Sequence, residues 1–146
     1  MSVAFGWLAA AAAALYTGGA VYAVLVEHPA RLASGPPMGI AEFRTSHPRA
    51  TRLQGGLLAL GGAGAVATWL AGAPAAWLGA GALLVAVLPY SRLAVGPTTR
   101  RLLDRALPPD EPEARRLLRR WGPLDAGRAI LAGAALAWMG HLLARG

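Results

Sequence analysis

Two short pairs of ionisable residues stand out in a chain that is otherwise strongly apolar. Glu27 and His28 are adjacent, and a carboxylate beside an imidazole can act as a general base with the group that orients it. Asp125 and Arg128 lie three residues apart, so a helix places them on one face, where they can form the polar floor of a ligand pocket. Each pair also has a purely structural interpretation. The first can simply end a helix at the membrane boundary, and the second can be an ion pair that fixes a helix.

Further polar side chains are expected at the same depth as these two pairs. Gln54 begins the second apolar stretch, Tyr90 ends the third, and the Thr99 hydroxyl can point into the same mouth. Together they predict one polar cluster at one end of an apolar bundle. Such a bundle can hold a flat apolar molecule whose polar edge faces the cluster. The predicted cluster comprises Glu27, His28, Gln54, Tyr90, Thr99, Asp125 and Arg128.

The sequence argues against several classes of site. The chain has no cysteine, which excludes disulfides, thiol nucleophiles and cysteine-based metal centres. Glu42 and His47 can join Glu27 and His28 in a metal site, but the spacing matches no standard ligand pattern, so we expect no metal. No Gly-rich phosphate loop or nucleophile elbow is present. We therefore expect no cofactor, and we expect the isolated His141 to be an interfacial residue.

The elements that position these residues follow from where charge is missing. The chain has 146 residues, 55% of them hydrophobic, and its basic residues are all arginine. Charge is absent from residues 1–26, 53–91 and 129–144. About 20 apolar residues of helix cross a bilayer, and the long middle run is broken at residues 72–74. We predict an all-α, four-transmembrane-helix bundle in a single domain, residues 1–146, with spans at about 3–26, 53–71, 75–95 and 124–143.

The first of these spans resembles a membrane helix more than a signal peptide. It has no basic segment before it, and its apolar run is too long for the core of a signal peptide. We therefore expect it to be retained in the bundle.

The distribution of arginine predicts the orientation. Thirteen of the 14 arginines and all seven acidic residues lie in or beside residues 27–52 and 92–128, and Arg145 lies at the opposite end. The positive-inside rule places both long connections in the cytoplasm and both termini outside. We expect a bacterial inner membrane, contacts with the lipid bilayer and anionic headgroups, and no nucleic-acid partner.

The two long connections carry local signals of their own. In the first, breaks at residues 28–29, 35–37 and 46–48 leave room for a short helix over 38–45, and we expect this connection to fold over the mouth of the bundle. In the second, Asp110 is expected to cap a short interfacial helix that has Pro112 and Glu113 in its first turn. Trp121 would lie at the membrane boundary at the end of that helix. A plain basic linker with Trp121 as an anchor remains an alternative.

Several segments, taken in order, resemble a family of small four-helix membrane proteins, some of which are named anthrone oxygenases. They lie along nearly the whole chain. The segments are Val26-Glu27-His28-Pro29-Ala30-Arg31-Leu32, Arg49-Ala50-Thr51-Arg52-Leu53-Gln54, Leu88-Pro89-Tyr90, Pro97-Thr98-Thr99-Arg100-Arg101-Leu102-Leu103, and Arg119-Arg120-Trp121 followed by Arg128.

The resemblance implies oxygenation of an anthrone to an anthraquinone without metal or flavin. A base would remove an acidic CH₂ proton, a cation would stabilise the oxyanion, and O₂ would react with the anion directly. On this basis Glu27, His28 or Asp125 would be the base, and Arg128 the cation. Trp121 or Tyr90 would stack on the rings. The resemblance thus makes Glu27, His28, Asp125 and Arg128 the candidate catalytic residues, with Gln54, Tyr90, Thr99 and Trp121 binding substrate.

The chain departs from the family pattern at two of these positions. The family usually has Asn at the position of Thr99 and His at the position of Asp125. These changes point to a different substrate or to a member without enzymatic activity. Two alternatives therefore stay open: a non-catalytic binder of quinones or lipids, and a structural subunit that uses its small-residue faces to pack against a partner or a second copy.

Overall fold

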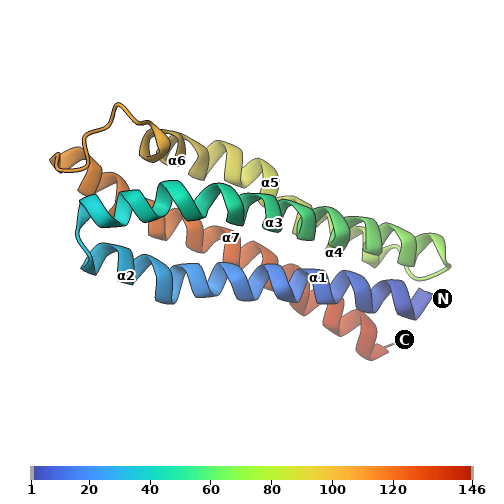
Figure 1. The fold of residues 1–146 in the computed structure, drawn as a ribbon. Coiled ribbons are helices and arrows are strands. Elements are labelled where there is room, and N and C mark those ends of the chain that lie inside the picture. Colours follow the sequence, from blue (N-terminus) through green and yellow to red (C-terminus); the bar gives the residue numbers. More distant parts are fainter. Residues whose placement is uncertain (1, 146) are drawn as a thin grey trace.

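A computed structural model of the protein describes residues 2–145, and 89% of the chain is helical with no strand in the described part. Four long helical rods run side by side in alternating directions (Figure 1). In chain order, the elements are α1 (Ser2–Tyr22), η1 (Ala23–Glu27), α2 (His28–Ala33), α3 (Pro36–Leu70), α4 (Ala76–Val85), α5 (Val87–Tyr90), η2 (Ser91–Val95), α6 (Gly96–Leu103) and α7 (Pro112–Arg145).

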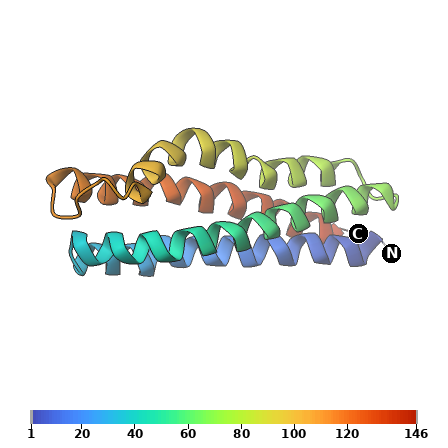
Figure 2. The same ribbon diagram turned by 45° about the horizontal axis from the view of Figure 1, so that its top comes forward.

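The rods form an up-and-down bundle, as predicted. Helix α1 packs against α3 and α7, and α4 packs against the same two helices from the other side. Both termini and the α3–α4 turn lie at one end, which we call the terminal end; the α2–α3 and α6–α7 connections lie at the other, the arginine-rich end (Figures 1 and 2). The four rods, Val3–Ala33, Pro36–Leu70, Ala76–Leu103 and Pro112–Arg145, are long and apolar enough to cross a membrane, which indicates an integral membrane protein.

Two turns connect consecutive rods at positions where the sequence predicts breaks in the helix. At the terminal end, Gly72 adopts a φ of +95°, a left-handed conformation that glycine tolerates, and Pro74 follows it. At the other end, Gly35 has a φ of +82° between α2 and α3. The predicted breaks at residues 72–74 and 35–37 are therefore confirmed.

The other predicted breaks in the first connection are wrong, because its prolines lie inside helices. The chain continues helically through Pro29, and Pro48 lies within the 35-residue helix α3. The short helix expected over 38–45 is thus part of α3, and the connection extends the bundle instead of folding over its mouth (Figure 1). A proline inside a helix costs about 3 kcal/mol. Ile40 and Phe43, which are buried on the same helix, supply tertiary packing that outweighs this cost.

Two wider helical turns accommodate prolines in the first and third rods. The π-helical segments η1 and η2 each end two residues before a proline, Pro29 and Pro97 respectively. A proline ring clashes with the carbonyl group four residues earlier, which here belongs to Leu25 or Leu93 inside the π-helical segment. The wider turn relieves that clash, and the His28 N–H bonds to the Ala23 carbonyl instead.

The second connection also differs from the prediction. Helix α7 runs without interruption from Pro112 to Arg145, through Pro123, so the residues predicted to form a separate interfacial helix are the first turns of the fourth rod. Asp110 is not the cap, because Pro112 is the first helical residue and Glu111 precedes it. Pro112 does occupy the first helical position, where its missing N–H costs nothing.

Two apolar cores follow each other along the bundle. The first lies toward the terminal end and is made largely of alanines with Tyr16, Leu84 and Met139. The second lies at the arginine-rich end and contains Ile40, Phe43, Val95, Leu102, Leu107, Ala114, Leu118 and Trp121. Helices α3 and α7, of 35 and 34 residues, are about 50 Å long and exceed a hydrocarbon core of about 30 Å. The second core therefore stabilises a part of the bundle that the sequence predicted as connections between the spans, with only short helices in them.

Glycine permits the closest approach of α1 and α3. A Cβ atom on Gly64 would lie 3.1 Å from the backbone nitrogen of Ala9, whereas one on Gly56 would meet nothing within 4 Å. We expect Gly64→Leu to force the two helices apart, at a cost of about 1–3 kcal/mol. Its melting temperature in detergent should fall by several degrees, while Gly56→Leu should melt like the wild type. Equal melting temperatures for both variants would contradict this packing.

Candidate functional site

The Arg128 guanidinium is the centre of a buried polar cluster. Its Nη1 donates to Asp125 Oδ1 at 2.7 Å, its Nε to the Tyr16 hydroxyl at 3.1 Å, and its Nη2 to Gln54 Oε1 at 2.5 Å. We call these four residues the Arg128 cluster. The structure thus brings together three of the predicted residues, Gln54, Asp125 and Arg128, from α3 and α7. Helix α1 adds Tyr16, which the sequence analysis missed.

The Arg128 cluster is closed and lies between the two cores. Asp125 and Arg128 are 2% and 8% exposed, and Tyr16 is fully buried. On α7, Trp121 belongs to the core at the arginine-rich end and Ala132 to the other core, so the ion pair falls at their junction. Because each donating nitrogen of Arg128 already has an acceptor, the cluster is built to hold helices together.

A second group lies one turn further toward the arginine-rich end. Trp121 lies against His28 at 5.5 Å between ring centroids and against Phe43 at 5.2 Å in an edge-on arrangement. His47 stacks on Phe43 at 4.7 Å. The indole N–H of Trp121 donates to the Thr99 hydroxyl at 3.2 Å. We call His28, Phe43, His47 and Trp121 the aromatic layer; it draws on α2, α3 and α7, with Thr99 from α6.

His28 is the unusual member of the aromatic layer. It is 6% exposed, and its Nδ1 has no hydrogen-bond partner among the described residues. Its ring lies where a Cβ atom on Gly122 would be only 2.5 Å away, so the glycine leaves room for the imidazole against α7. A buried ring nitrogen without a partner is costly in a purely structural setting. It is available to accept or donate a proton.

Arg31 links the aromatic layer to a small cavity. Its guanidinium lies 5.6 Å from the centroid of the Trp121 ring. Its Nη2 is 2.8 Å from Glu27 and donates to Ser46 at 2.9 Å, and its Nε pairs with Glu42. Arg31 also lines a cavity of about 270 Å³ together with Glu27, Ala30, Ser34, Met38, Gly39 and Glu42. Arg31 thus borders both the cavity and the aromatic layer.

The predicted residues do not form one cluster but lie in four places, of which the Arg128 cluster, with Gln54, Asp125 and Arg128, is one. Glu27 pairs with Arg31 beside the cavity, and His28, Thr99 and Trp121 form part of the second group. Tyr90 is separate: its hydroxyl donates to the Leu124 carbonyl at 2.9 Å and occupies space that Gly127 leaves free. Within residues 2–145, no three His, Asp or Glu side chains lie close enough to hold a metal ion.

Sequence reasoning also missed Arg31 and Phe43. Arg31 follows Glu27 by four residues, a spacing that predicts a helical ion pair once helix is expected through Pro29. Tyr16, the missed member of the Arg128 cluster, also had a signal in the sequence. It carries one of the few hydrogen-bonding groups in an apolar run, and such groups in membrane helices usually face a polar partner.

Comparison with protein families decides the relationship. The anthrone oxygenase family matches residues 43–138, well over half of the chain. The chain belongs to the anthrone oxygenase family. The matched residues include three members of the aromatic layer, all but His28, and three members of the Arg128 cluster, all but Tyr16. Glu27 and Arg31 also lie outside the matched residues. No curated protein and no solved structure matched the chain.

The Arg128 cluster makes a stability prediction. Arg128→Met leaves the Asp125 carboxylate buried without its cation, and breaking a buried pair in this way costs about 3–5 kcal/mol. Tyr16→Phe removes only one acceptor of the guanidinium and should cost about 1–3 kcal/mol. Thermal melting in detergent should rank Arg128→Met well below Tyr16→Phe. The double variant Asp125→Leu/Arg128→Met should recover much of the loss, and a double variant no better than Arg128→Met would refute the pairing.

Proposed function

We propose that the chain is a membrane-embedded, cofactor-independent oxygenase that converts a flat apolar anthrone-type substrate to a quinone, with His28 as the general base. The observation that carries this proposal is the buried, unpartnered Nδ1 of His28 against Trp121. Membership of the anthrone oxygenase family supports the reaction class. Among the three bases that the sequence offers, Asp125 already pairs with Arg128 and Glu27 with Arg31.

The chemistry needs only a base, a nearby cation and O₂. His28 Nδ1 takes a proton from the CH₂ opposite the anthrone carbonyl, and the electron pair moves onto the carbonyl oxygen because the resulting anion is aromatic. The anion gives two electrons to O₂, a C–O bond forms, and the returned proton completes a hydroperoxide. Loss of the second CH₂ hydrogen as a proton breaks the O–O bond, releases water and leaves the second carbonyl.

Each remaining residue has a part in this proposal. The substrate enters through the cavity beside Arg31 and displaces the guanidinium from the face of Trp121. Its rings then stack on the indole and reach His28, and the Arg31 cation stays beside the developing oxyanion. Glu27 and Glu42 hold Arg31 in place. Thr99 fixes the indole of Trp121. The remaining predicted residues, Gln54, Tyr90, Asp125 and Arg128, are positioning residues that set the depth and rotation of the rods.

The base is tested by O₂ consumption and quinone absorbance with a simple anthrone, in detergent and with chelator present. His28→Ala should lower the protein-dependent rate at least about a hundredfold, the scale of general-base catalysis. His141→Ala is the matched control, because His141 is exposed near the terminal end. Full turnover by a folded His28→Ala variant would rule out this base.

A second variant tests whether the rate depends on the position of the His28 ring. Gly122→Ala places a methyl group against the His28 ring and should lower the rate, because the imidazole must move. Wild-type protein that consumes no O₂ above autoxidation would overturn the oxygenase proposal.

We also propose that the arginine-rich end lies in the cytoplasm of a bacterial inner membrane and that both termini lie outside. The positive-inside rule supports this orientation. The absence of cysteine makes it testable with single-cysteine variants. A membrane-impermeant maleimide applied to intact spheroplasts should label Ala75→Cys, in the exposed terminal-end turn, and should label Ala106→Cys only after lysis. The reverse pattern would invert the orientation.

A further inference from the structure

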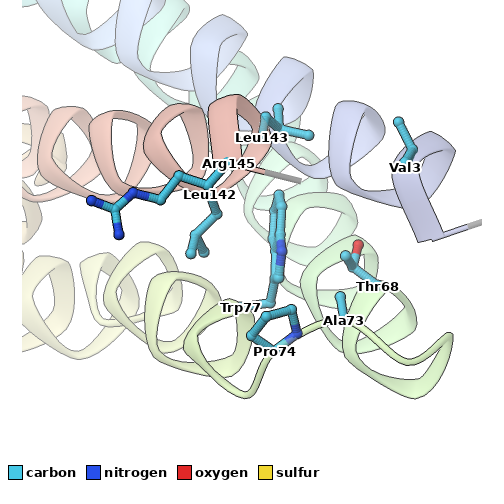
Figure 3. A pocket seen from close by; sticks show the side chains of 8 residues that line it. All are labelled: Val3, Thr68, Ala73, Pro74, Trp77, Leu142, Leu143 and Arg145. Carbon is cyan, nitrogen blue, oxygen red and sulfur yellow. The ribbon is translucent and has the colours of Figure 1, made fainter.

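The terminal end of the bundle contains an apolar cavity far along the rods from His28. It has a volume of about 400 Å³, within the range of small-molecule sites. Figure 3 shows side chains from all four rods and from the α3–α4 turn around it. The lining residues are Val3, Thr68, Ala73, Pro74, Trp77, Leu142, Leu143 and Arg145.

The walls of this cavity are held by packing and by the turn. Trp77 is 4% exposed, and its ring packs closely on α1 at Gly6, where a Cβ atom would lie 3.0 Å from the indole Cη2. The turn is fixed by the bond from the Trp77 N–H to the Pro74 carbonyl, 3.1 Å. The Thr68 hydroxyl donates to the Gly64 carbonyl at 2.7 Å, which satisfies its hydrogen. The cavity is therefore preformed and offers mainly apolar surface and two flat rings, Trp77 and Pro74.

One cation lies at the edge of this cavity, with its guanidinium directed past Leu142 and away from Trp77 (Figure 3). Among the described lining residues only Arg145 is charged, and Figure 3 shows its side chain extending from the end of α7 beside Leu142. All seven acidic residues of the chain lie between residues 27 and 125, and none of them lines this cavity. A guanidinium at the edge of an apolar cavity without acidic lining residues complements a ligand that carries a negative charge.

We propose that this cavity is a binding site for a small apolar aromatic anion, meaning a flat ring system with one carboxylate or phenolate group. The rings lie against Trp77 and Pro74, and the anionic group meets Arg145 at the mouth. A ligand of this kind needs both the apolar walls and the cation of the site. The proposal is independent of the oxygenase activity, because the cavity shares no residue with the aromatic layer.

The test uses two probes that differ in charge, 9-anthracenecarboxylate and anthracene. Each is titrated against the full chain in nanodiscs of phosphatidylcholine, with energy transfer from tryptophan to the probe as the signal and empty nanodiscs as the blank. Arg145→Gln removes the cation, and Arg120→Gln, exposed at the opposite end, is its matched control. Ala73→Leu fills the cavity, and Leu142→Phe does so from the other wall if the first variant does not fold.

We expect saturable binding of the carboxylate with one site per chain. Arg145→Gln should weaken it about tenfold, the loss expected for one charge-assisted contact, and should leave anthracene unchanged within about twofold. The filling variant should weaken both probes, and Arg120→Gln neither. Carboxylate binding that is unchanged in Arg145→Gln or in the filling variant would overturn the proposal, as would equal competition by laurate, which would indicate a lipid-chain pocket. Loss of O₂ consumption in His28→Ala with probe binding intact would separate the two sites.

Discussion

A guanidinium buried in an apolar bundle must have every strong donor satisfied, and the rest of this structure depends on that constraint. Arg128 cannot lose its charge, so it requires a counter-ion and acceptors from its surroundings. Asp125, one turn away on α7, supplies the counter-ion, and Tyr16 and Gln54 supply acceptors from α1 and α3. Because each acceptor has one place it can occupy, the three rods are fixed in both depth and rotation. Packing among the small residues of the neighbouring core does not by itself fix the depth and rotation of a rod.

Arginine performs the same cross-linking task at other points of the bundle. Arg31 binds Glu27, Glu42 and Ser46, which closes α2 onto α3. Arg44 donates to the carbonyls of Leu102 and Leu107, which holds the end of α6 and the following loop against α3. A planar fork with five donors suits these positions better than an ammonium group would. The arginines at this end therefore stabilise the interior of the bundle.

The sequence alone predicts the features that depend on composition and charge. It does not predict the features for which the local helix preference of a residue competes with its tertiary packing. Four apolar rods, the turn at Gly72 and the Asp125–Arg128 pair follow from apolar runs, a glycine and helical spacing. The continuous helices do not, because Pro48 and Pro123 each disfavour a helix locally, and the packing of the core at the arginine-rich end outweighs that cost. The prediction of which site residues lie together fails for a related reason. The rotation of each helix decides which side chains meet, and the rotation of α7 is set by a contact between Arg128 and Tyr16, which are 112 residues apart in the sequence.

Thr99 and Asp125 stand where the family resemblance led us to expect Asn and His, and their contacts suit the residues that are present. At position 125 the carboxylate neutralises Arg128, whereas a neutral imidazole would leave the buried guanidinium without a counter-ion. At position 99 the hydroxyl accepts the indole N–H of Trp121, a task that an asparagine carbonyl can also perform. The change at Thr99 is therefore conservative for packing, and the change to Asp125 strengthens the Arg128 cluster while removing a titratable ring from it. In the proposed reaction the proton transfer therefore falls to a group outside that cluster, and His28 in the aromatic layer has a ring nitrogen without a hydrogen-bond partner among the described residues.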